Sequence, residues 1–231
     1  MKSSDDITGQ TFDIFQAKRK ISSGSFGTVY FGINTVTNEQ VAIKVEKIVD
    51  EDLRSVLKEA KFLKHLEGVK GIPRVLYSGS KSDLDIMVIT LLAKDLVTYM
   101  KIYKRFSLKT GLMLLEQGLS ILENIHSKNI VHRDIKPENI LMGREKDAET
   151  VYFVDFGISK FYKDNFGRHI PFMENKVITF FSNFFRFLLL NFFFNFFPFL
   201  CQALSSPHSF FFILILKGLY WDNSLCFGSC T

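Results

Sequence analysis

The stretch that decides the fold of this chain runs His132-Arg133-Asp134-Ile135-Lys136-Pro137-Glu138-Asn139, and Asp155-Phe156-Gly157 follows it after a short polar segment. Apolar runs flank both segments, which predicts short buried strands that end at these polar residues. Two carboxylates, one lysine and one amide are thereby placed at strand and loop ends. A purely structural role would leave these four polar groups without a purpose.

These four side chains are the ones that phosphoryl transfer requires. Asp134 can receive or orient the proton of an acceptor hydroxyl, and Lys136 can offset charge on the moving phosphoryl group. Asp155 and Asn139 can hold magnesium against the phosphates of ATP. Either tripeptide alone would be a weak signal, but the whole run at this spacing is a strong one.

Composition divides the chain near residue 176. The 231 residues suffice for one large or two small domains. Residues 177–231 contain only three charged side chains but hold 15 of the 26 phenylalanines and all three cysteines. The formal net charge of +5 includes no basic stripe with interleaved aromatics, so nucleic acid is not expected as a partner. The absence of cysteine before residue 177 excludes a disulfide framework there and fits a reducing compartment. The polar, acidic N-terminus is unlike a secretory signal.

The N-terminal part predicts two strands, over 12–21 and 28–34, around the turn Ser22-Ser23-Gly24-Ser25-Phe26-Gly27. Gly24 and Gly27 would let backbone amides approach phosphate oxygens, so the turn could fold over a nucleotide. An ordinary hairpin turn is the alternative for this piece. A Rossmann-type site is disfavoured, because no helical pattern follows the glycines.

Lys44 lies in the otherwise apolar strand predicted over 40–45, where it is either a solvated edge residue or a functional cation. The segment 53–66 carries apolar residues at helical spacing, and Glu59 flanks that stripe. Glu59 is therefore either exposed at the rim or paired inward. An ion pair between Lys44 and Glu59 would aim the ammonium at phosphates.

Further elements complete the pattern. Strands are expected over 74–78 and 86–89, and Thr90-Leu91-Leu92 is a natural connector between two lobes. Ser107 opens a helix predicted over 107–126, which we expect to be mostly core and to carry the loop with Asp134. The apolar stripe of this helix is Leu108, Leu112, Leu115, Leu119, Leu122 and Ile125.

These residues together resemble a eukaryotic protein kinase and, more narrowly, the casein kinase I family of serine/threonine kinases. The resemblance covers about residues 12–176. The segments that carry it are Gly24-Ser25-Phe26-Gly27-Thr28-Val29-Tyr30, Val41-Ala42-Ile43-Lys44-Val45-Glu46, Gly71-Ile72-Pro73-Arg74-Val75, Phe106-Ser107-Leu108-Lys109-Thr110, Ile125-His126-Ser127-Lys128-Asn129 and His169-Ile170-Pro171-Phe172-Met173-Glu174-Asn175-Lys176.

The resemblance implies an α+β, two-lobed fold with a five-stranded N-lobe, an incomplete helical C-lobe, and ATP between them. It divides the chain into an N-terminal extension (1–11), an N-lobe (12–92), a partial C-lobe (93–176) and a Phe-rich tail (177–231). It implies that Lys44 holds the α and β phosphates, that Asp134 is the catalytic base, and that Asn139 and Asp155 bind Mg²⁺. Lys136 implies serine/threonine specificity, and Lys176 matches an anion-binding position for acidic or phosphorylated substrates. The residues implied to line the adenine and ribose pocket are Ile21, Ser23, Val29, Ala42, Ile89, Leu92, Leu141 and Val154.

The chain departs from the family pattern at four places. Ser22 replaces the first glycine of the phosphate loop, and Ala93-Lys94-Asp95 replaces the family's Gly-Pro-Ser. Met173 stands where the family has an arginine, which affects the expected substrate preference. After Lys176 the family continues with Gly-Thr-Ala-Arg-Tyr and several helices, whereas here the similarity stops.

The tail is best explained as translated non-coding sequence, such as a retained A/T-rich intron or a frameshift, because the charge density falls abruptly where the family similarity ends. Its Phe-rich sequence also lacks helical or alternating periodicity. A membrane anchor is the alternative, although polar residues break the apolar blocks to less than the length of a span.

Two functional classes follow for the whole chain. It is either a kinase that phosphorylates serine or threonine of proteins, or a catalytically impaired fragment that binds only nucleotide or a partner. We expect a monomer in the cytoplasm, and also in the nucleus in some settings.

Overall fold

The structure is a computed structural model that describes residues 6–24, 27–49, 54–164 and 166–170. All of these residues belong to one compact unit of the chain. The strands are β1 (Thr11–Phe12), β2 (Phe15–Gly24), β3 (Gly27–Asn34), β4 (Gln40–Lys47), β5 (Val75–Lys81), β6 (Leu84–Thr90), β7 (Ile130–Val131), β8 (Ile140–Met142), β9 (Val151–Phe153) and β10 (Lys160–Phe161). The helices are α1 (Ser55–His65), α2 (Leu96–Tyr103) and α3 (Leu108–Ser127), with short 3₁₀ turns at Pro137–Asn139 and Glu145–Asp147.

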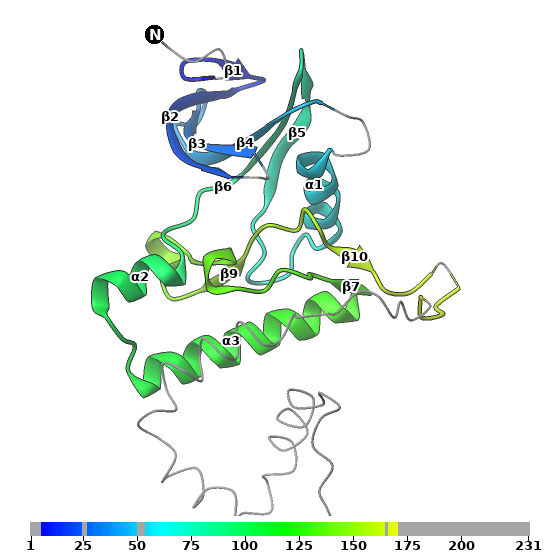
Figure 1. The fold of residues 1–231 in the computed structure, drawn as a ribbon. Helices are drawn as coiled ribbons and strands as arrows, with labels where there is room; N and C mark the ends of the chain where they lie inside the picture. Colours follow the sequence, from blue (N-terminus) through cyan, green and yellow to red (C-terminus); the bar gives the residue numbers. More distant parts are fainter. Residues whose placement is uncertain (1–5, 25–26, 50–53, 165, 171–231) are drawn as a thin grey trace, which may run out of the picture. The chain divides into compact units, whose positions relative to one another are not determined.

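An antiparallel sheet forms the N-terminal part, in the order β1-β2-β3-β4-β6-β5 (Figure 1). The prediction of a β-rich N-terminal part is confirmed, but the sheet has six strands where the resemblance implies five. The additional strand arises because the chain turns at Asp13, whose φ is +54°, so that Thr11 and Phe12 pair with the start of β2. The first long strand therefore begins at Phe15 and not at Phe12.

The side chains of strand β4 point to two different faces of the sheet, one in the apolar core and one that carries Lys44 and Glu46. Successive side chains of a strand point to opposite faces. Val41, Ile43 and Val45 are buried in the apolar core with Tyr30 and Phe15. The alternate residues of β4 point to the other face and are Ala42, Lys44 and Glu46. Because β4 lies between β3 and β6, Lys44 is not on an edge strand, and the solvated-edge interpretation of Lys44 is wrong.

Helix α1 packs against β4, β5 and β6. Its buried residues are Val56, Glu59, Ala60 and Leu63, which recur at helical spacing along one stripe. Glu59 thus lies within the packed stripe, and of the two alternatives for this residue the inward one is correct. In Figure 1 this helix (cyan) lies beside the sheet.

The connector after β6 joins the sheet to the short hairpin β8–β9. The amide of Ala93 donates to the carbonyl of Met142 over 2.9 Å, and the amide of Met142 donates to the carbonyl of Lys94 over 3.1 Å. Asp95, which follows, caps α2 by accepting a hydrogen bond from the amide of Thr98 over 2.7 Å. The expected connector is confirmed, and its backbone is fixed to β8.

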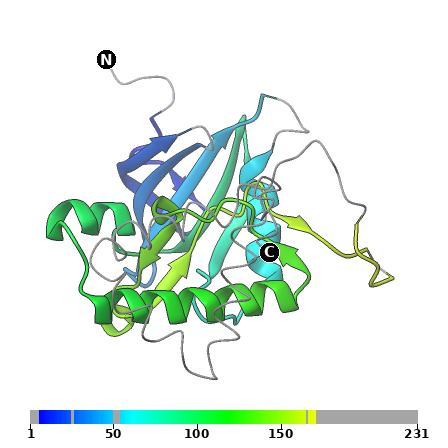
Figure 2. The same cartoon turned by 60° about the horizontal axis from the view of Figure 1, so that its bottom comes forward.

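Helix α3 starts as predicted, because the Ser107 hydroxyl accepts from the amide of Thr110 over 3.1 Å. It lies against β7 and β9 (Figures 1 and 2). The predicted stripe is confirmed only in part: Leu122 and Ile125 are buried, whereas Leu108 and Leu112 are 44% and 54% exposed. The helix is rotated relative to the predicted stripe because it packs against β9, where the amide of Val151 donates to Gln117 Oε1 over 3.0 Å. The buried residues are Gly111, Leu114, Gly118, Ile121, Leu122 and Ile125.

The tail prediction, for residues 177–231, and the role predicted for Lys176 concern residues outside the described part of the chain. In the part that is described, no helix is both long and apolar enough to cross a membrane.

Candidate active site

A cavity of about 530 Å³ lies between the sheet, the connector and the hairpin β8–β9. Its apolar walls come from β2, β3, β4, β6 and β8, and its polar end is formed by Lys44, Glu59, Asn139 and Asp155. Most of the residues predicted for a nucleotide pocket line it. These are Ile21, Val29, Ala42, Lys44, Glu59, Ile89, Leu92, Asn139, Leu141, Val154 and Asp155.

Two residues predicted for this pocket, Ser23 and Gly24, do not line the cavity. The Ser23 hydroxyl instead lies 2.9 Å from that of Thr28 on β3, in an exposed position. Ser22 takes its place in the lining, because an irregularity in the pairing of β2 with β3 between Lys20 and Ser22 shifts the side chains by one position. Residue-by-residue transfer from a family could not detect that irregularity.

Other lining residues were not predicted. They are Thr90, Leu91, Ala93, Lys94, Asp95, Thr98 and Glu138. Most of them follow Ile89 directly along the connector, so their position next to predicted lining residues could have identified them in the sequence. Thr98 is different: it reaches the cavity because α2 starts at Asp95, and the Thr98 hydroxyl donates to Asp95 Oδ2 over 2.7 Å.

Lys44 joins three separate parts of the chain at the polar end of the cavity. Its Nζ lies 2.6 Å from Glu59 Oε2 on α1 and 3.3 Å from Asp155 Oδ1 in the loop after β9. Burial alone would lower the pKa of Lys44, but the charges of Glu59 and Asp155 outweigh it and raise the pKa above its ordinary value. The ammonium is therefore held in its charged form and faces the cavity.

Glu59 also binds the loop that carries Asp155. Its second oxygen, Oε1, accepts from the amide of Phe156 over 3.3 Å. Phe156 is fully buried, and its ring lies 4.4 Å, centroid to centroid, from the ring of His132. Asp155 itself has a φ of +66°, a left-handed conformation that a non-glycine residue adopts at a cost. The surrounding contacts hold this conformation and turn the Asp155 carboxylate toward Lys44.

Asp134, Lys136 and Asn139 form a second polar cluster. Lys136 Nζ lies 2.6 Å from Asp134 Oδ2, and Asn139 Nδ2 donates to the same oxygen over 2.8 Å. The amide nitrogen of Asn139 donates also to the Asp134 carbonyl over 2.9 Å. Asp134 Oδ2 therefore has two donors. The structure thus brings together the three residues that the sequence predicted for proton handling, charge compensation and metal binding.

His132 connects this cluster to the strand before Asp155. Its Nδ1 accepts from the amide of Asp134 over 3.2 Å, so Nε2 carries the proton and donates to the Val154 carbonyl over 3.0 Å. Burial lowers the pKa of His132 to about 4, so the ring is neutral at pH 7. A neutral, buried imidazole therefore fixes the distance between the two loops.

The donor set fits a magnesium ion with a bound nucleotide. Asn139 uses its amide nitrogen for Asp134, which leaves Oδ1 as its ligand atom, and Asp155 supplies a carboxylate on the same cavity wall. Mg²⁺ in nucleotide sites is typically held by one or two such oxygens together with substrate phosphates. When bound, the ion would neutralise charge on those phosphates. Among the described residues, no three His, Cys, Asp or Glu side chains cluster as a metal site.

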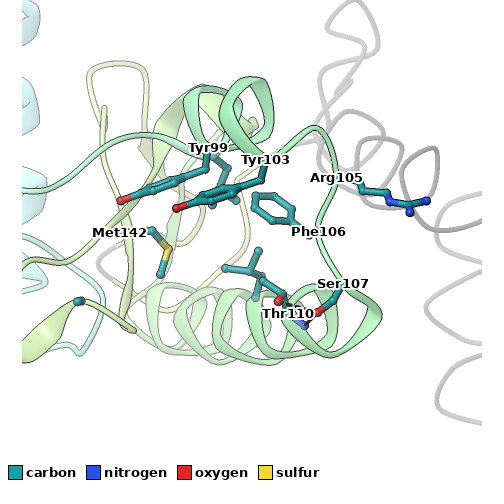
Figure 3. A pocket seen from close by; sticks show the side chains of 10 residues that line it. Tyr99, Tyr103, Arg105, Phe106, Ser107, Thr110 and Met142 are labelled. Atoms are coloured by element: carbon teal, nitrogen blue, oxygen red, sulfur yellow. Dashed lines mark hydrogen bonds between the residues drawn. The ribbon is translucent and has the colours of Figure 1, made fainter.

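A second hollow of about 490 Å³ lies between α2 and the start of α3 (Figure 3). Tyr99 and Tyr103 stack along it with their ring planes 7° apart, and Phe106 and Met142 contribute further apolar lining. Figure 3 shows that the Arg105 side chain extends away from it. The acids, lysine and amide described above are not among its lining residues, so the first cavity is the candidate active site.

Comparison with known families agrees with this geometry. A sequence model of the protein kinase domain matches residues 15–180. The match spans the sheet, the cavity and both polar clusters, and it covers more than half of the chain. The chain therefore belongs to the protein kinase family, a class of transferases whose members generally use ATP and Mg²⁺.

Proposed function

We propose that this protein transfers the γ-phosphate of ATP to serine or threonine hydroxyls of proteins, in the manner of the casein kinase I family. The observation that carries the proposal is the bridging position of Lys44, whose Nζ contacts both Glu59 and Asp155. Kinase chemistry requires this lysine, its glutamate partner and the metal-binding aspartate to be in place together. The three residues come from β4, α1 and the loop after β9.

The proposed roles of the side chains follow from their surroundings. Lys44 would bind the α and β phosphates, and Asp155 and Asn139 would bind Mg²⁺. Asp134 would orient the acceptor hydroxyl and take its proton through Oδ1, because Oδ2 accepts from Lys136 and Asn139. The apolar walls would hold the adenine and ribose.

Serine/threonine specificity is proposed from Lys136, which lies two residues after Asp134 and bonds to it. The narrower family is proposed from the segments quoted above, including His169-Ile170, which lies at the end of the described part. By that resemblance the substrates are acidic or already phosphorylated proteins, with Lys176 as one anion contact. On the same basis we propose that the protein is a monomer and that it is located in the cytoplasm, with the nucleus as a second site.

A second candidate is a protein that binds nucleotide or a protein partner without phosphate transfer. The family match ends at residue 180, and after Lys176 the sequence departs from the family's substrate-positioning segment Gly-Thr-Ala-Arg-Tyr, which favours this candidate. Its polar clusters would bind nucleotide as described, but no acceptor hydroxyl would be brought to Asp134.

One experiment separates the two candidates. The full chain is incubated with Mg²⁺ and γ-labelled ATP on casein, and labelled phosphoserine and phosphothreonine are quantified. Asp134→Asn, which keeps the shape but cannot take a proton, should lower incorporation by about 10²–10⁴-fold. Incorporation no higher than that of this variant, with a nucleotide-induced rise in Tm retained, would establish the second candidate. Incorporation on tyrosine would contradict the assigned specificity.

A further inference from the structure

The first turn of α1 has no cap of its own. A helix start leaves backbone N–H groups without intrahelical partners, and the residue before the helix usually supplies an acceptor. Here that residue is Arg54, whose side chain makes no capping bond, and the first turn contains no acidic residue. The other two helices differ, since Asp95 caps α2 and Ser107 caps α3.

A carboxylate from another element supplies the missing acceptor. Glu46, on β4, accepts from the amide of Val56 over 3.0 Å through Oε2 and from the hydroxyl of Ser55 over 2.8 Å through Oε1. A negative charge is favourable at a helix N-terminus, where the peptide dipoles leave a partial positive charge. Glu46 therefore caps α1 from a strand eight residues before the helix begins.

The same face of β4 holds α1 at a second point. Lys44 and Glu46 are two residues apart, so their side chains share one face of the strand, about 6.7 Å apart along it. Lys44 contacts Glu59, and Glu46 contacts Ser55. Ser55 and Glu59 are four residues apart on one face of the helix, about 6 Å along its axis. The two spacings match, so two polar contacts join α1 to β4, in addition to the apolar stripe that packs the helix against the sheet.

The two partners of the capping contact lie near the two glycine segments of the site, Glu46 near Gly27 and Ser55 near Gly157. A Cβ built on Gly27, at the start of β3, would lie 3.5 Å from Glu46 Cβ and only 2.3 Å from the carbonyl oxygen of Val45. A Cβ built on Gly157, after Phe156, would lie 3.7 Å from Ser55 Cβ. The capping contact is therefore packed between the strand that follows the glycine turn and the loop that carries Asp155.

We propose that Glu46 is a positioning residue for the active site, because its cap on α1 fixes the rotation of that helix and thereby holds Glu59 against Lys44. The apolar stripe packs α1 against the sheet, and the two polar contacts, one helical turn apart, define the rotation of the helix and its height on β4. For nucleotide binding this inference rests on the proposed function, whereas the contact between Lys44 and Glu59 can be tested separately from nucleotide binding.

The test compares Glu46→Ala, Glu46→Gln and a matched control, Ser107→Ala, in the full chain. The control removes the cap of α3, which lies away from the cavity, and so reproduces a loss of capping without touching α1. Glu46→Gln keeps one acceptor for the Val56 amide, while its NH₂ group can donate to the Ser55 hydroxyl. It should therefore stay closer to the wild type than Glu46→Ala.

The first measurement follows Lys44 itself. Its rate of acetylation by acetic anhydride is measured by mass spectrometry, with Glu59→Gln as the variant that weakens the ion pair directly. A buried, paired ammonium reacts slowly, so Glu46→Ala should raise the rate severalfold, as Glu59→Gln does, and Ser107→Ala should not. An unchanged rate in Glu46→Ala would overturn the proposal.

The second measurement is the Kd of a fluorescent ATP analogue with Mg²⁺. Glu46→Ala should weaken binding about five- to tenfold, a change typical of the loss of one cap, whereas Ser107→Ala should leave the Kd unchanged. Equal weakening in the two variants would also overturn the proposal. A wild type that binds no nucleotide would refute the proposed function alone, and the acetylation rates would then still decide the role of Glu46.

Discussion

Asn139 Nδ2 donates a hydrogen bond to Asp134 Oδ2 over 2.8 Å. This single contact links the residue proposed as a magnesium ligand to the residue proposed as the base. Because the side-chain nitrogen of Asn139 is committed to Asp134, the same bond sets the orientation of Asn139 Oδ1. In the proposed mechanism, metal affinity and the position of the base would therefore be coupled.

Replacement of Asn139 by alanine should accordingly affect both functions. We expect the Mg²⁺ concentration for half-maximal phosphate transfer to rise about 10- to 100-fold, because a ligand oxygen is lost. The measurement is a magnesium titration of the initial rate. Asn124→Ala is the matched control, since Asn124 is exposed on α3 and its side-chain amide donates to the Ser120 carbonyl of the same helix. An Asn139→Ala variant with the magnesium dependence of this control would refute the assigned role.

The ion pair of Lys44 and Glu59 predicts a non-additive effect on stability. Lys44→Met should lower the free energy of unfolding by about 3–5 kcal/mol, since it leaves the Glu59 carboxylate buried without its partner. Adding Glu59→Gln should recover part of that loss, because the uncompensated charge is removed. Urea unfolding of the two single variants and the double variant measures the coupling. Strict additivity of the two losses would show that the residues do not act as a pair.

His132 predicts a loss of stability in mild acid. The pKa of His132 is about 4 in the folded protein and 6.5 in its ordinary state. Between these values the unfolded chain binds a proton that the folded one does not, so stability falls as the pH decreases from about 6.5 to about 4. The full loss is about 3 kcal/mol, at about 1.4 kcal/mol for each pKa unit.

The measurement is the free energy of unfolding against pH for the wild type and for His132→Gln. The difference between the two curves isolates this residue from other groups. Asp85 is one such group, because its bond with Arg54 lowers its pKa and also costs stability in acid. A difference curve that stays flat from pH 6.5 to pH 4 would contradict a buried neutral imidazole.

Gly71 lies where α3 and β9 leave no room for a side chain, which predicts a steric constraint at this position. Its φ is +85°, and a Cβ there would lie 2.4 Å from Ile121 Cδ1 on α3 and 2.8 Å from the carbonyl oxygen of Val151 on β9. Gly71→Ala should therefore lower the free energy of unfolding by about 2–4 kcal/mol, from backbone strain and overpacking together. Gly68→Ala is the matched control: its φ is +84° with nothing within 4 Å, so only the strain of about 1–2 kcal/mol applies. Equal losses of Tm would refute the packing contribution.

The chemistry of the site could be predicted from the sequence because it depends on residue type and local spacing. Asp134, Lys136 and Asn139 lie within one short loop, so their proximity follows from the chain itself. The pairing of Lys44 with Glu59 could also be anticipated, since a charge beside an apolar helical stripe is either exposed or paired. Their contact with Asp155 joins residues far apart in the chain, and there the family resemblance supplied what local spacing could not.

Other features depended on tertiary packing. Leu108 and Leu112 continue the apolar pattern of α3 but are exposed, because the helix turns toward β9, whose Val151 amide donates to Gln117. The irregularity that moves Ser22 into the cavity, and the turn at Asp13 that adds β1, are backbone events without a distinctive side-chain signal. The cap that Glu46 provides for α1 joins two elements whose sequences give no sign of each other.

The connector that lines the cavity is bound to β8 through main-chain atoms: the amide of Ala93 and the carbonyl of Lys94. The Gly-Pro-Ser of the resembling family preserves this pattern, since glycine retains the amide and proline retains the carbonyl. These main-chain hydrogen bonds do not depend on which side chains occupy positions 93 and 94, with one exception. Proline at position 93 would remove the amide donor. Other substitutions at positions 93 and 94 can therefore change the side chains that line the cavity without breaking the link, whereas proline at position 93 cannot.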